Sequence, residues 1–319
     1  MSGGARGKDV PVTVVMSVYN AERYLTRAVR SILEQDFVDF EFIVIDDGST
    51  DGSRAILRSF ADERLVVIEQ ANQGLPNALN RGIRESRAPL IARIDADDIA
   101  RPDRLRLQVD FLERHSDYVA VGSNATVIDA DGDYVYTTAQ PLDDGTLRAR
   151  LPETPFIHPS SMFRKAAFDA AGRYCEQMIT AQDTVLFNRL MRLGKAANLA
   201  EPLIEYRVVP TSISQRGRTC AEFSRIIARA IEGNSISADD AAHLAVRMKG
   251  GKGHDRVVGY HTFLAKKLLW NSYRPGEARE HLRKSLSVRP TWEAGFLYGA
   301  SFLPETVVRR AYQLGKSLF

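Results

Sequence analysis

Cysteine and long apolar runs are scarce in this sequence. The 319 residues include two cysteines, Cys175 and Cys220, which lie far apart and in no metal-binding spacing. They argue against a disulfide scaffold and for a reducing compartment. No apolar run approaches the ~18–20 residues that span a bilayer, and the first residues lack the apolar segment of a signal peptide. We therefore expect a cytoplasmic protein.

Glycine-rich phosphate-binding motifs are also missing. The first predicted strand is not followed by G-x-G-x-x-G, and G-x-x-x-x-G-K-[ST] occurs nowhere in the chain. A Rossmann dinucleotide site and a P-loop both need those glycines, whose backbone N–H groups hold the phosphates. If the protein binds a nucleotide diphosphate, a metal ion must hold its phosphates instead.

The first hundred residues contain a regular alternation of strands and helices. Hydrophobic periodicity predicts strands over 10–18, 40–46, 64–69 and 90–94, and helices over 21–35, 51–61 and 75–86. Such alternation predicts an α/β fold with a parallel sheet and helices on its faces. Ligands of these sheets bind beyond the carboxyl ends of the strands.

Carboxylates gather at the end of the fourth predicted strand, in the stretch "LIARIDADD". Asp95 and Asp97 are two residues apart, so in an extended segment they project to the same side. Two carboxylates ~4 Å apart repel by about 4 kcal/mol at an effective dielectric of about 20. A bound Mg²⁺ or Mn²⁺ turns that repulsion into affinity. Asp98 and Asp103 are explained equally well by the start of the next helix.

Four other residues have both a structural and a functional interpretation. Asp47, in "IDDGSTDGS", either organises a turn or accepts hydrogen bonds from a nucleotide base or ribose. Tyr19 is either a core aromatic or a ring that stacks on a base. Asp183 begins a predicted helix, where it is an N-cap, a first-turn charge or a general base. His158 lies in a stretch that is predicted to form an apolar strand. There it is either a core residue or a contact to the substrate.

The pattern changes after the predicted helix at 101–115. Residues 118–129 and 134–141 flank an Asp-Gly turn and are predicted to form an antiparallel pair. Beyond residue 215 only helices are predicted. Residues 221–319 contain 16 lysines and arginines but 9 aspartates and glutamates. The basic segment 304–319 is predicted either to lie on anionic lipid or to pack with its charges solvated.

Several motifs together resemble one known family. "VPVTVVMSVYNAERYLTRAVRSILEQDFVDFEFIVIDDGSTDGS", then "NQGLPNALNRGI", then "LIARIDADDIARPDRL" resemble glycosyltransferase family 2, the inverting enzymes of GT-A fold, over residues 10–210. The resemblance implies a GT-A type, Rossmann-like, mostly parallel sheet flanked by helices, with an all-helical C-terminal appendage. The domains expected are a disordered N-terminus (1–10), a catalytic domain (11–214, with a nucleotide-sugar half, 11–100, and an acceptor half, 101–214) and the helical appendage (215–319).

The resemblance also implies roles for residues at the predicted donor site. Ser17, Tyr19 and Asp47 match positions that hold the base and ribose. Asp95 and Asp97 match the family's D-x-D motif, with Asp97 as the direct ligand of Mn²⁺ or Mg²⁺ and Asp95 as a contact to the ribose or to the metal and its water.

Two further residues match the acceptor side. Asp183 matches the general base, although Gln182 precedes it where the family typically has an acidic residue, which removes one neighbouring charge. His158, in "HPSSMFR", matches a stretch that lines the acceptor side in the family.

The function implied is metal-dependent, inverting transfer from a nucleotide diphosphate sugar, with a UDP-sugar favoured. The acceptor expected is a saccharide or a lipid-linked molecule in bacterial surface polysaccharide or glycolipid synthesis, and nucleic acid is not an expected partner. Peripheral contact with the inner face of the cell membrane, through the basic C-terminal helix, is one of the two alternatives that stay open for that segment. Two alternatives remain: an inactive nucleotide-sugar-binding scaffold, and a D-x-D phosphatase with Asp95 as nucleophile, whose motif would normally follow the first strand.

Overall fold

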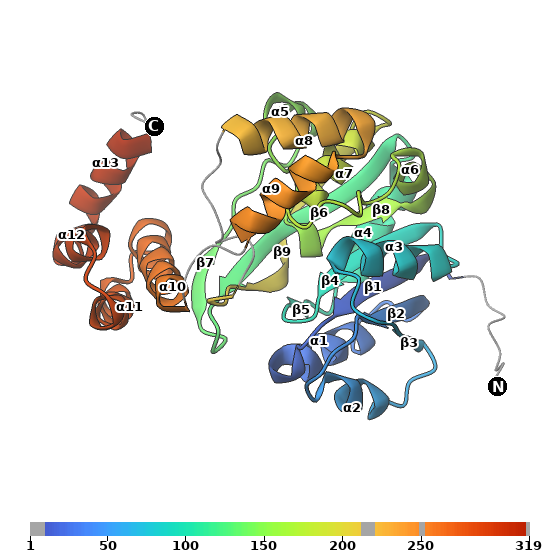
Figure 1. Ribbon diagram of the computed structural model, residues 1–319, viewed down its shortest axis with the longest axis horizontal. Coiled ribbons are helices and arrows are strands. Elements are labelled where there is room, and N and C mark those ends of the chain that lie inside the picture. The colour runs from blue at the N-terminus through green and yellow to red at the C-terminus, as the bar shows by residue number, and fades with distance from the viewer. Residues whose placement is uncertain (1–9, 212–220, 249–252, 317–319) are drawn as a thin grey trace. The chain divides into compact units, whose positions relative to one another are not determined.

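The computed structural model describes residues 10–211, 221–248 and 253–316 (Figure 1). Apart from Val10, the predicted disordered N-terminus lies outside the described residues. The chain packs into two compact units. Among the described residues, the first unit comprises 10–125, 139–206 and 221–245, and the second comprises 126–138, 207–211 and 246–316. This grouping reflects packing, so the predicted division at residue 214 stays a prediction about function.

The first unit contains most of the sheet. Its strands are β1 (Val12–Val18), β2 (Phe40–Asp46), β3 (Leu65–Glu69), β4 (Leu90–Asp95), β5 (Ile99–Ala100), most of β6 (Tyr118–Ile128), β8 (Met162–Arg164) and most of β9 (Lys195–Arg207). Its helices are α1 (Glu22–Leu33), α2 (Ser53–Arg58), α3 (Leu75–Glu85), α4 (Arg104–Arg114), α5 (Asp144–Ala149), α6 (Lys165–Ala170), α7 (Gln182–Leu190) and α8 (Ala221–Gly233), with a short η1 (His158–Ser160). Most of α9 (Ala238–Met248) also belongs to it.

The strand order is β3-β2-β1-β4-β8-β6-β9-β5, and β7 (Tyr134–Thr137) pairs with β6 off this path. The pairs β1–β2, β1–β4 and β2–β3 are parallel, whereas β4–β8, β6–β8, β6–β7 and β5–β9 are antiparallel. The predicted α/β class with its Rossmann-like parallel half is therefore confirmed. The antiparallel strands extend the same sheet from β4 outward.

Strand alternation divides the core into two layers. Val14 and Met16 of β1 belong to a buried cluster with α1 and α4, for example through Val29 and Val109. Val15 faces the other way, into a cluster that includes residues of α3 and α7. Because successive side chains of a strand point to opposite faces, odd-numbered positions of β1 lie on the α3 and α7 side, and Ser17 shares this parity.

The second unit consists of the β6–β7 hairpin and helices. The helices are α10 (Gly253–Lys267), the π-helical η3 (Leu268–Ser272), α11 (Pro275–Val288), α12 (Trp292–Ala300) and α13 (Glu305–Lys316). The hairpin is tied to α10, since the backbone N–H of Ala130 donates to the Tyr260 hydroxyl at 2.9 Å. No helix among the described residues is long and apolar enough to cross a membrane.

One local prediction is wrong. His158 was predicted to lie in an apolar strand, but it begins the 3₁₀ turn η1, and the strand β8 starts only at Met162. Pro159 explains the difference, because proline has no N–H to donate to a sheet and is favoured in the first turn of a helix. His158 is therefore placed by a turn that precedes the strand.

Candidate active site

The ends of β1, β2 and β4 bring predicted donor-site residues to one edge of the sheet. Ser17 of β1 stands in register with Asp95 of β4 on one side and with Ile45 of β2 on the other. Tyr19 follows the end of β1, and 53% of it is exposed. The tyrosine is therefore no core residue, and its ring is available to a ligand.

Asp47 follows β2 and organises the loop between β3 and α3. Its carboxylate accepts hydrogen bonds from Gln70 Nε2 at 2.7 Å and from the backbone N–H groups of Gln73 and Gly74, both at 2.9 Å. Only 2% of Asp47 is exposed. A contact to a base or ribose therefore stays a prediction, whereas the contacts observed hold the loop that borders this edge of the sheet.

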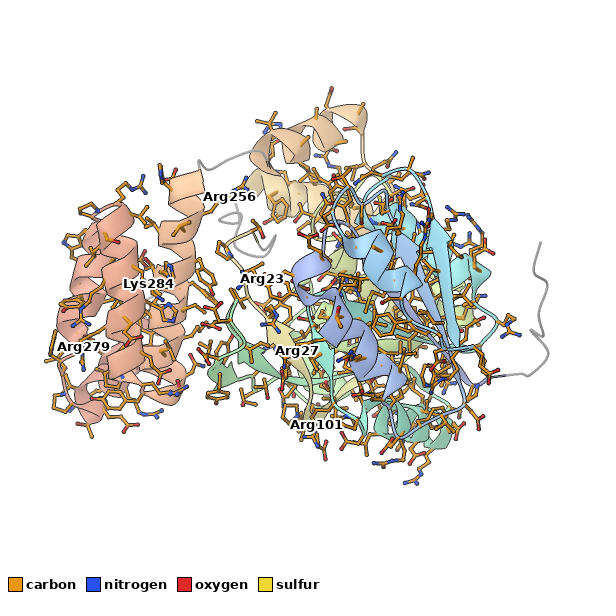
Figure 2. All side chains as sticks on the ribbon, turned by 90° about the horizontal axis from the view of Figure 1, so that it is seen from below. Arg23, Arg27, Arg101, Arg256, Arg279 and Lys284 are labelled. Atoms are coloured by element: carbon orange, nitrogen blue, oxygen red, sulfur yellow. The ribbon has the colours of Figure 1, made fainter. Side chains whose placement is uncertain are left out.

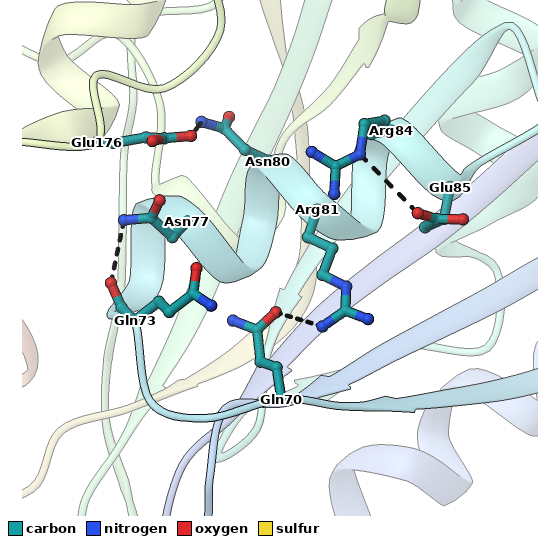
Figure 3. A pocket seen from close by; sticks show the side chains of 8 residues that line it. All are labelled: Gln70, Gln73, Asn77, Asn80, Arg81, Arg84, Glu85 and Glu176. Carbon is teal, nitrogen blue, oxygen red and sulfur yellow. Dashed lines mark hydrogen bonds and ion pairs between the residues drawn. The ribbon is translucent and has the colours of Figure 1, made fainter.

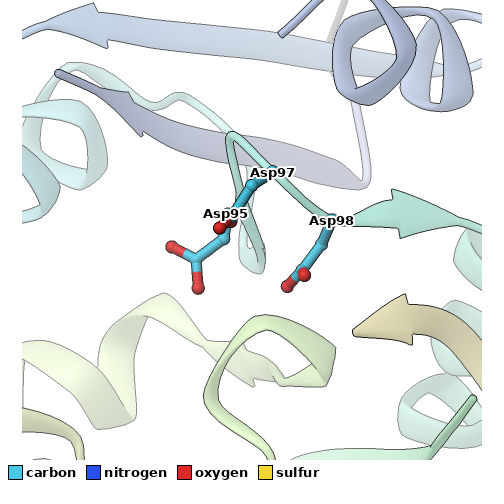
Figure 4. A group of neighbouring side chains, drawn as sticks. All are labelled: Asp95, Asp97 and Asp98. Atoms are coloured by element: carbon cyan, nitrogen blue, oxygen red, sulfur yellow. The ribbon is translucent and has the colours of Figure 1, made fainter. Parts of the chain in front are cut away.

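Three carboxylates cluster at the end of β4 (Figure 4). Oxygen atoms of Asp95, Asp97 and Asp98 all lie within 4.8 Å of one another. Asp98 is fully buried and precedes β5, whereas α4 begins only at Arg104, so Asp98 does not start that helix. A compact set of carboxylate oxygens is the donor type that Mg²⁺ and Mn²⁺ prefer. The cluster fits the predicted metal site and adds a third candidate ligand to it.

A buried arginine accompanies this cluster. Arg93 lies two residues before Asp95 on β4, and its Nη1 forms an ion pair with Asp95 Oδ2 at 2.5 Å. The Arg93 side chain is 2% exposed and that of Asp95 is 32% exposed. Burial alone would lower the pKa of Arg93, but attraction to Asp95 outweighs it and the pKa is raised. Arg93 therefore carries a fixed positive charge beside the candidate metal ligands.

A second buried arginine supports the first. Arg104 of α4 is fully buried, and its Nη2 donates to the backbone oxygen of Arg93 at 2.6 Å. Burial lowers the pKa of Arg104 to about 9, against the attraction of the Asp98 carboxylate. The Asp98 carboxylate thus stabilises the buried charge of Arg104, besides any contact with a metal.

Asp183 also interacts with the charge of Arg93. It is the second residue of α7, which follows Ala181 in a left-handed conformation at φ 56°. Burial raises the pKa of Asp183, while the backbone N–H of Thr184 and the charge of Arg93 act in the opposite direction. Asp95 raises the pKa further. Asp183 is therefore close enough to Arg93 and Asp95 for Coulomb interactions, and it holds protons more tightly than an ordinary aspartate.

His158 lies against the same centre. Its Nε2 and the Tyr174 hydroxyl are 2.7 Å apart, and its ring packs edge-on against those of Tyr174 and Phe187. Burial, and then the charge of Arg93, lower the pKa of His158 well below its usual range. His158 is therefore a neutral imidazole bonded to a tyrosine, and its predicted place on the acceptor side stays a prediction.

A polar pocket of about 430 Å³ borders the loop that Asp47 holds (Figure 3). Gln70 and Gln73 belong both to this loop and to the pocket wall. Asn80 of α3 and Glu176 bond to each other across the pocket at 3.1 Å. The remaining lining residues are Asn77, Arg81, Arg84 and Glu85. The pocket lies beside the loop, and its lining includes none of the clustered carboxylates.

Two members of the site were missed in the sequence. Arg93 had a signal, since an arginine inside an apolar strand two residues before an aspartate predicts an ion pair on one face. Tyr174 had none, because its contact with His158 depends on the path of the chain between β8 and α7. The roles of the predicted residues remain predictions, but the structure does bring Ser17, Asp95, Asp97 and Asp183 into one compact unit.

Comparisons with known proteins agree with this geometry. The family model described as "Glycosyl transferase family 2" matches residues 13–172, which is half of the chain. The succinoglycan biosynthesis protein ExoO of Rhizobium meliloti (strain 1021) is 29% identical over 242 residues, covering 74% of this chain and 65% of that protein. The amylovoran biosynthesis glycosyltransferase AmsE of Erwinia amylovora is 30% identical over 212 residues, covering 64% and 79%.

Solved structures show the same fold. The crystal structure of S. aureus TarS 1-349 in complex with UDP-GlcNAc superposes with a TM-score of 0.56 at 17% sequence identity, over 96% of this chain and 92% of that chain. TarS 1-349 in complex with UDP gives a TM-score of 0.55 at 16% identity. At such identities the likeness concerns the fold alone.

Proposed function

Because the chain belongs to glycosyltransferase family 2 and is an enzyme of that class, we propose that it moves a sugar from a nucleotide diphosphate sugar to a saccharide or lipid-linked acceptor, in a metal-dependent reaction with inversion. A UDP-sugar is the proposed donor, with support from TarS, which was solved with UDP and with UDP-GlcNAc. The names of ExoO and AmsE refer to polysaccharide biosynthesis. They support a pathway of the same kind for this protein.

One observation carries the proposal. A carboxylate with a raised pKa, Asp183, lies on α7, while a cluster of carboxylates lies at the end of β4, with the charge of Arg93 acting on both. Asp183 and the clustered carboxylates lie on different elements, so they can take different tasks. One group is suited to proton transfer, and the others are suited to holding a cation.

The proposed reaction is a single displacement. The acceptor oxygen forms a bond to the anomeric carbon, while the bond from that carbon to the diphosphate oxygen breaks through an oxocarbenium-like state. Asp183 takes the proton from the acceptor hydroxyl as it attacks, and a raised pKa favours that transfer. The electron pair of the broken bond leaves with the nucleoside diphosphate.

Asp95, Asp97 and Asp98 would hold Mn²⁺ or Mg²⁺. When bound, the ion stabilises the charge that develops on the departing diphosphate. Arg93 fixes the Asp95 carboxylate through its ion pair, so that the cluster is preformed. Ser17, Tyr19 and Asp47 are proposed to hold the base and ribose, and His158 is proposed to line the acceptor side.

The proposal is tested by calorimetric binding of UDP, GDP and dTDP, each with Mn²⁺ and again with EDTA. We expect tight binding of UDP that collapses in EDTA, because the chain lacks a glycine-rich phosphate loop. Asp97→Asn should weaken binding in Mn²⁺, while Asp110→Asn, at a half-exposed aspartate of α4, should not. Nucleotide binding with no turnover for any sugar tried would favour the inactive scaffold instead. Family membership already excludes the phosphatase alternative.

We also propose that the C-terminal helices bring the enzyme to the inner face of the cell membrane, where a lipid-linked acceptor is found. The support is the excess of basic residues in this part of the chain.

A further inference from the structure

Helix α12 exposes large apolar side chains on one face. Trp292 is 83% exposed and Phe296 is 60% exposed, and their rings stack with centroids 5.4 Å apart and planes 8° from parallel. Ala294 and Leu297, on the opposite face, are buried. At 3.6 residues per turn, positions 292 and 296 lie on one side of the helix, and position 303 continues that side just beyond its end. Leu303 is 44% exposed.

The neighbours of these side chains leave the face flat and uncharged. Gly295 and Gly299 lie next to Phe296 on the helix, and a Cβ added to either would meet nothing within 4 Å. Glu293 is the one acidic residue of α12, and it forms an ion pair with Lys266. We define Trp292, Phe296 and Leu303 as the aromatic face. It presents apolar surface to solvent with no uncompensated negative charge.

Basic side chains lie over two further rings of this segment, those of Phe302 and Tyr298. The Arg279 guanidinium lies 4.8 Å from the ring centroid of Phe302, which is 64% exposed, and that of Arg283 lies 5.8 Å from the ring of Tyr298. Figure 2 shows Arg279 and Lys284 on this helical unit. Residues 246–319 contain 14 lysines and arginines against 5 aspartates and glutamates. Exposed apolar rings on a helical unit with an excess of basic side chains suit the interface of an anionic bilayer.

We propose that the aromatic face is the surface by which this protein docks on anionic lipid. Tryptophan and phenylalanine enter the boundary between headgroups and acyl chains, and the arginines contact the phosphates. A second copy of this chain suits the face less well. A two-fold interface places the same patch against itself, which would bring the basic side chains of this unit in both copies together.

The helix proposed here to contact lipid differs from the segment that the sequence predicted. The predicted contact was the segment 304–319, but within α13 Arg309 pairs with Glu305 and Val308 is 4% exposed. The large exposed rings precede that segment. The lipid contact is therefore led by α12 and the turn after it. The reason for docking, which is access to a lipid-linked acceptor, rests on the proposed function, whereas the lipid contact itself does not.

The test uses the full chain and vesicles of phosphatidylcholine with and without phosphatidylglycerol. The chain has two tryptophans, and Trp292 is far more exposed than the half-buried Trp270. We expect sedimentation with the anionic vesicles and a blue shift of the tryptophan emission. The double variant Trp292→Ser, Phe296→Ser should weaken vesicle binding by about tenfold or more. Arg283→Gln should weaken it by about fivefold.

Matched controls lie in the other compact unit. Val38 is 64% exposed, so Val38→Ser removes an exposed apolar side chain there, and Arg27→Gln removes an exposed charge. Neither should change vesicle binding. Unchanged binding of the double variant would overturn the proposal. The proposal would also be overturned if the unchanged chain did not bind vesicles but dimerised as its concentration rose, and if the double variant did not dimerise. The aromatic face would then bind a second copy of the chain. No donor or metal is present, so the outcome is independent of whether the proposed transfer is correct.

Discussion

Arg93 is 2% exposed in the first compact unit, whereas Trp292 is 83% exposed in the second. Each is the opposite of what its residue type prefers. Burying a charge requires a partner charge and hydrogen bonds, and exposing a large ring forgoes the free energy of burying it. Neither arrangement helps the chain to fold. Both therefore indicate use, but of different kinds: buried charge suits chemistry, and exposed apolar surface suits docking.

The largest expected effect separates these two uses. Asp183→Asn removes the proposed proton acceptor but keeps the size of the side chain at the start of α7. We expect kcat to fall by about 10²–10⁴-fold with little change in donor affinity. Steady-state kinetics and calorimetry on the same variant measure both quantities.

The comparison also predicts the reciprocal result. Asp183→Asn should bind anionic vesicles as the unchanged chain does, while the Trp292→Ser, Phe296→Ser variant should keep its kcat on a soluble acceptor. Asp110→Asn, at a half-exposed aspartate of α4, serves as the charge-matched control. If Asp183→Asn retained full turnover, the base would have to be another group.

A smaller effect is expected from the buried arginine. Arg93→Met leaves Asp95 without its ion-pair partner, which should cost about 2–4 kcal/mol of folding free energy, less than a fully buried pair because 32% of Asp95 is exposed. Arg93→Lys keeps a positive charge and should lose less. Thermal unfolding of both variants measures the difference.

The pH profile of activity shows whether Arg93 acts on the proposed base Asp183 or only stabilises the fold. Asp183 accepts a proton only when ionised, so activity should fall as the pH falls through its raised pKa. The charge of Arg93 lowers the pKa of Asp183, so Arg93→Met should move this acid limb to higher pH, and Arg93→Lys should move it less. An acid limb that stays in place in Arg93→Met would mean that the arginine acts on stability alone.

Much of the first unit was predictable because its signals are local. The strands β1 to β4 follow from apolar runs alternating with helical periodicity, and the cluster at Asp95 and Asp97 follows from strand-end spacing. The convergence of Asp183 and Arg93 was not readable from the residues alone, since it depends on how distant segments pack. The family motif anticipated a shared site for Asp183 and the aspartates at the end of β4, but it gave no role to Arg93.

The second unit was harder to predict for a related reason. Residues 292–300 include two glycines, and apolar residues lie on both sides of the helix, so no amphipathic period marks it. A pattern of this kind is typical of a buried segment. That one of its faces is exposed follows only from the packing, where Ala294 and Leu297 occupy the buried side.

The smallest expected effect concerns the loop between β3 and α3, whose backbone N–H groups bond to the buried Asp47 carboxylate. Gly48 and Gly74 both have positive φ, at 78° and 86°, so alanine at either position should cost about 1–3 kcal/mol through backbone strain. A Cβ at Gly48 would also meet the backbone nitrogen of Asn72 at 2.8 Å, whereas a Cβ at Gly74 would meet nothing within 4 Å. Gly48→Ala should therefore also displace the loop whose N–H groups bond to Asp47.

The two alanine variants form a matched pair, because they share the backbone strain and differ in the clash. We expect Gly48→Ala to weaken nucleotide binding by about tenfold more than Gly74→Ala, while the two lose similar stability apart from the clash. Calorimetry and thermal unfolding on both variants measure this. Equal losses of affinity would indicate that backbone strain alone disturbs the site, and Asp47 would then be a residue that only stabilises its loop. A selective loss in Gly48→Ala would tie nucleotide binding to the backbone donors that keep the Asp47 charge buried.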